Sequence, residues 1–249
     1  MNFERYAKQI NIPEFGVDGQ EKLDDASVLI IGAGGVGSTV MYALAAAGVG
    51  TIGIADPEIV KVDDLNRQFI HFEDDIGTLK VTSASRKLRQ LNSLINVIPH
   101  AVAINKDNAY EIIAQYDIVA LAVNSFQAKM IVNQACYETE TPFVVGSVGP
   151  FCGTCAFVDP KTTPCLQCLY GTEFPPEDKF DSISSSNAAI GAVMADSIIQ
   201  YLVNASSDMT GKFLYLDTRK AVMDVTPIVG KKNCPVCGKQ KFATIGDAE

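Results

Sequence analysis

The feature that most constrains this chain is a glycine pattern placed directly after a short apolar run. Residues 27–31 read SVLII, and Gly32, Gly34 and Gly37 follow in the spacing G-x-G-x-x-G. Asp56 ends the next apolar run. A strand, a tight turn, a helix with free N–H groups and an acid after the second strand together suit ribose and phosphate. The pattern therefore predicts a nucleotide-binding α/β fold.

The glycine pattern alone leaves two other interpretations open. The turn could serve only close helix packing, or it could hold NAD in a dehydrogenase, because NAD and ATP both present ribose and phosphate. Arg67 and Lys80 lie downstream, in LNRQF and DIGTLK. Two cations beside the turn suit a triphosphate, although each taken singly could be a solvated surface charge. We therefore expect ATP.

Alternating apolar runs and helical patterns predict the fold class. We expect a Rossmann-like, doubly wound, mainly parallel α/β sheet, followed by an antiparallel C-terminal extension. We expect one domain over residues 1–249, with a nucleotide-binding core (1–150), a substrate-side extension (151–249) and an exposed loop at 170–186. The predicted strands are 27–31, 51–55, 96–104, 117–122, 142–147, 154–158, 212–217 and 221–229, and the predicted helices are 37–47, 79–91, 108–115, 127–137 and 187–204.

Charge and hydropathy exclude several partners. Asp and Glu outnumber Lys and Arg by 29 to 20, and the net charge of -9 repels nucleic acid and anionic membranes at long range. The first residues lack the apolar core of a signal peptide, and no apolar stretch approaches the length of a membrane span. We expect a soluble cytoplasmic protein.

Four of the seven cysteines form two C-x-x-C pairs. Cys165 and Cys168 lie in CLQC, and Cys234 and Cys237 lie in CPVC. Four thiolates fit a closed, structural Zn²⁺ site without an open position for catalysis. The alternative is four reduced, buried cysteines.

The remaining cysteines and both histidines carry no predicted chemistry. Cys152 and Cys155 share the C-x-x-C spacing, but they enter a predicted strand, where residues i and i+3 point to opposite faces. We expect them, and Cys136, to be core residues. His71 and His100 are too isolated to indicate a Ser-His-Asp or Cys-His site.

Several motifs stand in a recognisable order. RYAKQI, GQEKL, VLIIGAGGVGS, AAAGVGTIGIAD, DLNRQF, DIGTLK, PCLQC and CPVCG resemble the ThiF/MoeB family of ubiquitin-activating-like adenylyltransferases, from about Arg5 to Gly238. The resemblance implies a homodimer that binds ATP and Mg²⁺ and adenylates a carboxylate. In that family the carboxylate is commonly the C-terminal glycine of a ubiquitin-like sulfur carrier.

The resemblance also carries roles onto matching positions. Lys8, within RYAKQI, would reach into the partner subunit's site, and Arg67 and Lys80 would hold the triphosphate. Asp56 would hold the ribose, and the four paired cysteines would hold zinc. The residues implied at the nucleotide are Gly34, Gly35, Asp56, Asp63, Asn66, Arg67, Lys80, Val123 and Asn124.

The chain departs from the family pattern in the motif that supplies the Mg²⁺ ligand. Where T-D-N is usual, this sequence has Val123, Asn124 and Ser125, so the metal-binding aspartate is missing. Asp64 stands where S-N-L-x-R-Q has asparagine. We hypothesise that Asp64, together with Asp63, replaces the missing Mg²⁺ ligand; the alternative is two solvated loop acids.

Two further departures concern the reaction. Lys8 replaces an arginine, which keeps the charge and loses bidentate grip. Residues 169–233 contain no cysteine for a thioester, so we expect the reaction to stop at the acyl-adenylate.

The substrate is left open by these departures. It is either a small-molecule acid in cofactor biosynthesis, such as the pyridinol carboxylate of the iron-guanylylpyridinol cofactor, or the C-terminal glycine of a carrier protein. The alternative function is a non-catalytic nucleotide-binding partner in an activating complex.

Overall fold

A computed structural model describes residues 3–171 and 181–238, and these residues build an eight-stranded sheet. Its order is β3-β2-β1-β4-β5-β6-β7-β8, with parallel pairing from β3 to β5 and antiparallel pairing from β5 to β8. This arrangement confirms the predicted doubly wound sheet and its antiparallel extension. The strands are β1 (Ser27–Ile31), β2 (Thr51–Ala55), β3 (Asn96–His100), β4 (Ile118–Leu121), β5 (Phe143–Val148), β6 (Cys152–Val158), β7 (Lys212–Asp217) and β8 (Val222–Pro227).

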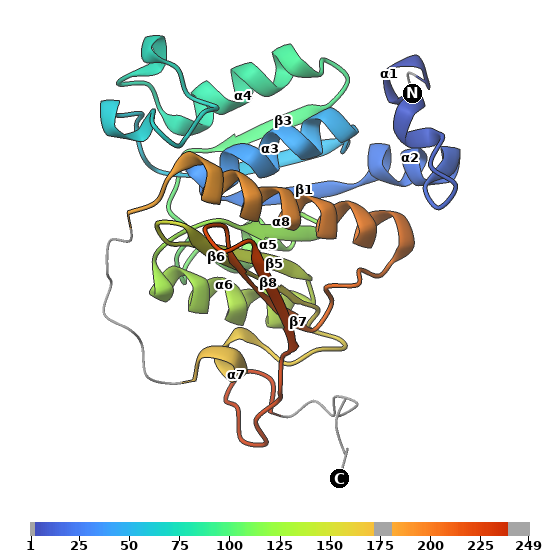
Figure 1. Cartoon of the computed structure of the whole chain (residues 1–249), viewed down its shortest axis with the longest axis vertical. Coiled ribbons are helices and arrows are strands. Elements are labelled where there is room, and N and C mark those ends of the chain that lie inside the picture. Colours follow the sequence, from blue (N-terminus) through green and yellow to red (C-terminus); the bar gives the residue numbers. More distant parts are fainter. Residues whose placement is uncertain (1–2, 172–180, 239–249) are drawn as a thin grey trace.

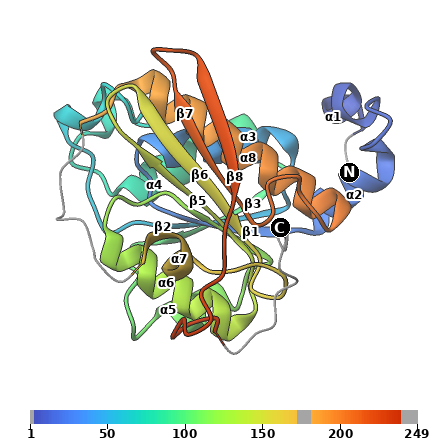
Figure 2. The ribbon, with the colours of Figure 1, turned by 60° about the horizontal axis from the view of Figure 1, so that its bottom comes forward.

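Helices cover both faces of the sheet, as Figures 1 and 2 show. The α3, α4 and α8 helices share one apolar core with alternate residues of the central strands, and α5, α6 and α7 share the other. No helix in the described parts of the chain is both long and apolar enough to cross a membrane. The helices are α1 (Phe3–Ile10), α2 (Gly16–Asp25), α3 (Gly35–Ala47), α4 (Lys80–Leu91), α5 (Ala109–Ile113), α6 (Phe126–Thr139), α7 (Leu166–Tyr170) and α8 (Ser184–Asn204).

The strand order creates a topological switch point at the carboxyl edge of the sheet. The chain leaves β1 toward β2 on one side and returns to β4 on the other, and ligands of doubly wound folds bind at such a switch point. The register pairs Ile31 with Ala55 and with Leu121, so the residues after all three strands lie side by side. The glycine turn, Asp56 and the segment after β4 therefore meet at one place.

Several element boundaries differ from the sequence predictions. The helices α1 and α2 were not predicted, because their apolar residues are few and their stability comes from packing of Tyr6 and Leu23 against the rest of the chain. The strand predicted at 96–104 ends at His100, and α8 begins at Ser184. The predicted loop at 170–186 lies partly outside the described residues, and Tyr170 belongs to α7.

The predictions for the three cysteines outside the proposed zinc site are confirmed in part. Cys136 and Cys155 are buried in the core as expected. Cys152 is only partly buried, because it is the first residue of β6 and lies at the end of the strand, next to the turn from β5. The prediction that Cys152 is a core residue is therefore wrong.

Candidate functional site

The glycine turn is tight at two of its positions. Gly32 has a φ of +102°, and a Cβ there would lie 2.5 Å from the carbonyl oxygen of Ala122. A Cβ on Gly37 would lie 2.0 Å from the carbonyl oxygen of Gly32. Both positions thus require glycine, Gly32 for its conformation and Gly37 because the first turn of α3 presses on the turn.

The start of α3 offers backbone N–H groups at the carboxyl edge of the sheet. Gly34 is its N-cap and supplies no side-chain acceptor, and the N–H of Ser38 donates to the Gly34 carbonyl at 2.9 Å. The N–H groups that precede Ser38 in the helix therefore lack intrahelical acceptors. A Cβ on Gly34 would meet nothing closer than Gln68 Nε2 at 3.8 Å. The N–H groups without intrahelical acceptors and the helix dipole favour an anion here.

Gly35 lies against α8. A Cβ at this position would lie 2.3 Å from Oδ1 of Asn187. The Cα atom of Gly35 therefore packs closely against α8. Gly35 is also the first residue of α3, so its N–H belongs to the first turn of that helix. The predicted contact of Gly35 with phosphate stays a prediction.

Asp56 is buried at the end of β2. One carboxylate oxygen accepts a hydrogen bond from the Ala33 N–H at 2.8 Å, and the other accepts from the Glu58 N–H at 2.8 Å. Burial raises the pKa of Asp56 above its usual value, and the two backbone N–H donors and Lys80 oppose that rise. Each carboxylate oxygen can accept a second hydrogen bond, so Asp56 can anchor the turn and still accept one from a ribose hydroxyl.

Two basic side chains converge on Asp64 in the segment after β2. Lys80 is 3% exposed, and its Nζ lies 2.6 Å from Oε2 of Glu58 and 3.5 Å from Oδ2 of Asp64. Arg67 Nη2 lies 3.8 Å from Oδ1 of Asp64. We call Arg67 and Lys80 the cation pair. Arg67 also donates to the Asp63 carbonyl and to Oδ1 of Asn66, at 2.6 and 2.9 Å.

Asp64 already has partners within the chain. Its Oδ2 accepts from the Lys61 N–H at 3.0 Å, and its Oδ1 accepts from Gln68 Nε2 at 2.7 Å. Asp63 is exposed, and within the described residues its carboxylate makes no hydrogen bond or ion pair. Val123 and Asn124 lie two and three residues after the end of β4, at the same edge, and Asn124 is exposed. The role of Asp64 at a metal stays a prediction.

Three residues near this edge were missed by the sequence reasoning. Glu58 pairs with Lys80, and this hydrogen bond is the main cause that lowers the pKa of Glu58. Gln68 is buried, and its Oε1 has no hydrogen-bond partner in the described parts of the chain. His71 contacts the glycine turn directly through the carbonyl of Ala33, at 2.9 Å. Only Gln68 had a signal in the sequence, because it completes the LNRQ motif.

Lys8 lies far from these residues. The α1 helix is attached by Gln9 to the carbonyl of Ala47, at 2.7 Å, and Ala47 ends α3. The 13-residue α3 runs about 18 Å from the glycine turn to that end. Figure 1 shows α1 on the far side of the molecule from the segment after β2. Lys8 therefore does not join the site of its own chain.

The two C-x-x-C pairs come together. Cys165 lies 3.4 Å from Cys234 and Cys168 lies 3.4 Å from Cys237, Sγ to Sγ. All four Sγ atoms lie within 4.8 Å of one another, and all four residues are buried. This donor set can hold one tetrahedral Zn²⁺. It would join the start of α7 to the C-terminal segment.

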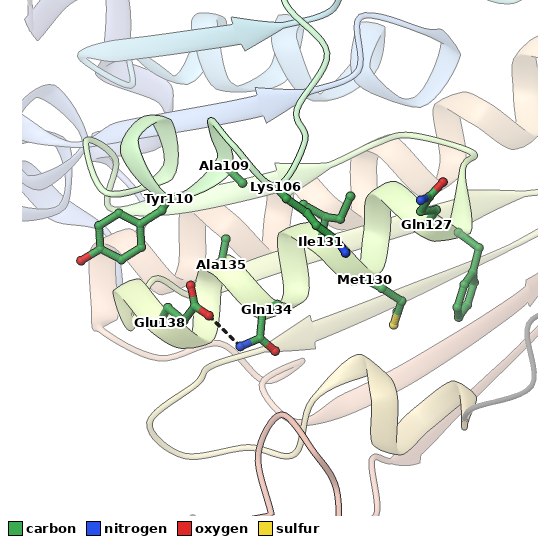
Figure 3. Close-up of a pocket in the computed structure, with 10 residues that line it drawn as sticks. Lys106, Ala109, Tyr110, Gln127, Met130, Ile131, Gln134, Ala135 and Glu138 are labelled. Atoms are coloured by element: carbon green, nitrogen blue, oxygen red, sulfur yellow. Dashed lines mark hydrogen bonds between the residues drawn. The ribbon is translucent and has the colours of Figure 1, made fainter.

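A cavity of about 660 Å³ lies elsewhere, between α6 and the segment that leads into α5 (Figure 3). None of the residues predicted for the nucleotide site lines it. We assign the functional site to the carboxyl edge of the sheet instead, because the glycine turn, Asp56 and the cation pair meet there. The cavity is lined by Lys106, Ala109, Tyr110, Phe126, Gln127, Met130, Ile131, Gln134, Ala135 and Glu138.

Comparison with known proteins agrees with this fold. The model of the ThiF family matches residues 6–236. A sulfur carrier protein adenylyltransferase from Thermus thermophilus is 32% identical over 248 residues, which is 95% of this chain and 91% of the relative. An adenylyltransferase and sulfurtransferase MOCS3 from Culex quinquefasciatus is 36% identical over 96% of this chain.

The coverage of the relatives is unequal. The chain spans 56% of the Culex protein and 58% of a MOCS3 protein from Dictyostelium discoideum. Among solved structures, E. coli MccB in complex with MccA-N7isoASN has a TM-score of 0.85 and 23% identity, over 96% of this chain and 77% of that one. At this identity the likeness concerns the fold.

Proposed function

The chain belongs to the ThiF family, and on that premise we propose that it is an ATP-dependent adenylyltransferase that activates a carboxylate as an acyl-adenylate. The observation that carries the proposal is the cation pair. Arg67 and Lys80 share Asp64 at the edge where the glycine turn and Asp56 lie. Two positive charges beside the start of a helix suit a triphosphate, whereas a dinucleotide carries less charge there.

The proposed reaction needs no nucleophile from the protein. A carboxylate oxygen of the substrate attacks the α-phosphorus of ATP, the bond from that phosphorus to the bridging oxygen breaks, and pyrophosphate leaves. The chain must hold two anions together and stabilise the charge on the leaving group. We assign the phosphates to the N–H groups at Gly34 and Gly35, the ribose to Asp56, and the leaving pyrophosphate to Arg67 and Lys80. Asn66 would orient Arg67.

A magnesium ion, when bound, would neutralise phosphate charge. We propose Asp63 and Asp64 as its carboxylate ligands, with Asn124 at the position of the usual aspartate. Because Asp64 also accepts from Gln68 and lies beside Lys80, its substitution would disturb the cation pair as well. Asp63 is exposed and offers the cleaner test of metal binding.

The metal assignment can be tested with three variants. Asp63→Asn and Asp64→Asn are each expected to raise the Mg²⁺ concentration needed for half-maximal turnover, and Asn124→Asp is expected to lower it. Unchanged magnesium dependence in both asparagine variants would exclude these two acids as ligands. The exposed Asp107→Asn, outside the residues assigned to the site, serves as the control.

Exchange of radiolabelled pyrophosphate into ATP tests the function itself. We expect exchange only when a suitable carboxylate is present, and we expect Lys80→Ala to lower its rate by about two orders of magnitude. ATP binding without exchange, across carrier-protein tails and small aromatic acids, would favour the alternative of a non-catalytic nucleotide-binding partner. NAD binding that is indifferent to Mg²⁺ would favour a dehydrogenase.

We propose two classes of carboxylate for this test. The sulfur carrier named for the Thermus relative supports a protein tail. The missing metal aspartate and crossover cysteine support a small acid, such as a pyridinol carboxylate. We further propose a cytoplasmic homodimer, in which Lys8 of each chain enters the partner subunit's site.

A further inference from the structure

His71 is a buried side chain that touches the glycine turn and has no role in the proposed reaction. It is 3% exposed and lies between Arg67 and Lys80 in the sequence. Its Nε2 lies 2.9 Å from the carbonyl oxygen of Ala33, between Gly32 and Gly34. Asp56 accepts the N–H of the same Ala33 at 2.8 Å. Both peptide groups that flank Ala33 are therefore held by buried side chains.

The hydrogen bonds are consistent with one tautomer of neutral His71. A carbonyl oxygen only accepts, so Nε2 carries the hydrogen, and Nδ1 of the neutral ring then accepts from the Ser83 hydroxyl, at 2.9 Å. Ser83 Oγ in turn accepts from Lys87 Nζ at 2.9 Å, and Lys87 pairs with Asp75. Ser83 and Lys87 belong to α4, and Asp75 ends the short 3-10 helix η2 (Glu73–Asp75). A chain of polar contacts therefore runs from Asp75 to the glycine turn.

Burial and the neighbouring lysines favour the neutral form of His71. Burial is the main cause that lowers the pKa of His71 below its usual 6.5. The positive charges of Lys80 and Lys87 on α4 lower it further, whereas the bond to Ala33 and the charge of Asp75 act in the opposite direction. Neutral imidazole, with one donor and one acceptor, matches Ala33 on one side and Ser83 on the other.

We propose that His71 is a positioning residue of the nucleotide site. It holds the Ala33 carbonyl while Asp56 holds the Ala33 amide. The glycine turn is thereby pre-organised to present its N–H groups to phosphate. The inference rests on the proposed function, because it needs a nucleotide at the turn. A glycine-rich segment loses much conformational freedom when it becomes ordered. A turn that is ordered before the ligand arrives does not lose that freedom on binding, so affinity for the phosphates rises.

Two substitutions separate the contact with Ala33 from the contact with Ser83. His71→Gln places an amide nitrogen near the position of Nε2, so it can still donate to the Ala33 carbonyl. His71→Asn ends near the position of Nδ1, so it reaches Ser83 but not Ala33. The affinities of ATP and of adenosine, which has no phosphates, are measured by equilibrium titration, together with the thermal unfolding midpoint.

We expect His71→Asn to weaken ATP binding about tenfold, the effect of one lost hydrogen bond, and adenosine binding less than about twofold. His71→Gln is expected to stay within about threefold of the unsubstituted protein for both ligands. A merely structural role would lower the unfolding midpoint and both affinities together, and that outcome would overturn the proposal. An unchanged ATP affinity in His71→Asn would overturn it too.

A second variant keeps the test decisive if His71→Asn does not fold. Ser83→Ala removes the donor to Nδ1 and leaves the imidazole in place, and it is expected to weaken ATP binding about threefold without changing adenosine binding. Equal affinity for ATP in Ser83→Ala would contradict the hydrogen-bonded chain. If the unsubstituted protein binds neither ATP nor adenosine, the proposed function itself fails, which is a different result from an ATP-binding protein that is indifferent to His71.

Discussion

Lys80 lies between two carboxylates, and they fix the position of its ammonium group. Glu58 and Asp64 hold its Nζ in place, while the side chain itself is almost fully buried. Such a cation loses little freedom when a phosphate arrives, and it is only partly neutralised because Glu58 is exposed. The same carboxylate of Asp64 also fixes Arg67. Asp64 is therefore a determinant of the cation pair regardless of its predicted role at a metal.

Lys80→Met tests this arrangement at one residue. We expect pyrophosphate exchange to fall by about two orders of magnitude, because one of two charges at the leaving group is lost. Adenosine affinity should stay unchanged, because Asp56 is intact. Lys80→Arg is the matched control and should recover part of the activity. Equal exchange rates for Lys80→Met and the unsubstituted protein would remove Lys80 from the site.

Lys129 provides a prediction about pH and stability. It is buried in α6, and within the described residues its Nζ bonds only to the Ser147 hydroxyl. Burial lowers its pKa from 10.5 to about 8, which corresponds to a folding cost of about 3 kcal/mol for the charged form. Because the unfolded chain keeps its proton up to higher pH, stability rises as pH increases from about 8 to 10.5.

Lys129→Met is therefore expected to stabilise the protein at pH 7 by roughly 2 kcal/mol, after the lost hydrogen bond is deducted. The advantage should shrink as pH rises toward 10.5. Urea unfolding at a series of pH values measures it. The exposed Lys161→Met is the control, and a stability difference independent of pH would contradict the burial of a charged amine.

At the scale of elements, the join between β1 and α3 depends on two kinds of glycine. Gly37 has backbone against it, whereas Gly34 has open space and a φ of -91° that any residue adopts. The first is needed for packing, and the second is needed only if a ligand approaches the backbone. Substitution at these two positions therefore separates the fold from the site.

Gly37→Ala is expected to destabilise the protein strongly, by about 3 kcal/mol or more, because its Cβ cannot avoid the Gly32 carbonyl. Gly34→Ala should leave the unfolding midpoint within a few degrees and weaken ATP binding more than adenosine binding. Thermal unfolding and equilibrium titration provide both measurements. If the Gly34→Ala variant binds ATP as tightly as the unsubstituted protein, the phosphates do not bind at this turn.

The cysteine cluster joins α7 to the C-terminal segment, and it lies apart from the residues assigned to ATP. We expect the purified protein to contain about one zinc per chain, and we expect chelation or Cys234→Ser to lower the unfolding midpoint by several degrees. Metal analysis and calorimetry test this. Cys136→Ser, in the core but outside the cluster, is the control and should keep the zinc. A chain that folds equally well without metal would leave four buried thiols.

For the whole molecule, the position of α1 determines how a complete site can form. The α1 helix that carries Lys8 is attached at the C-terminal end of α3, about 18 Å along that helix from the glycine turn of its own chain. If Lys8 contributes to the reaction, it must come from a second copy. Closed two-fold symmetry would then give two equivalent sites per dimer.

Mixing two impaired variants tests this assembly. Lys8→Ala and Lys80→Ala are each expected to lose most exchange activity, but chains mixed under conditions that allow subunit exchange should regain about a quarter of full activity. Half of the dimers would then be mixed, and each mixed dimer would hold one intact site. No recovery, with subunit exchange confirmed by mass, would show that Lys8 does not act in the partner's site. The organisation of the chain as a single domain also stays a prediction.

Sequence alone determined the α/β class, the parallel core and the antiparallel extension, because apolar periodicity and turn residues are local signals. It also identified the glycine turn with Asp56 and the two cysteine pairs, whose spacings follow directly from the chemistry they suit. It missed α1 and α2, since those helices depend on distant packing partners.

Only the tertiary structure decided the environment of individual side chains. His71 meets Ala33 across 38 positions of sequence, and its partner Ser83 comes from α4. Asp64 was expected to be free for a metal, yet it accepts from Lys61 and Gln68. Burial and hydrogen bonding depend on which elements come together, and that is a property of the packed chain.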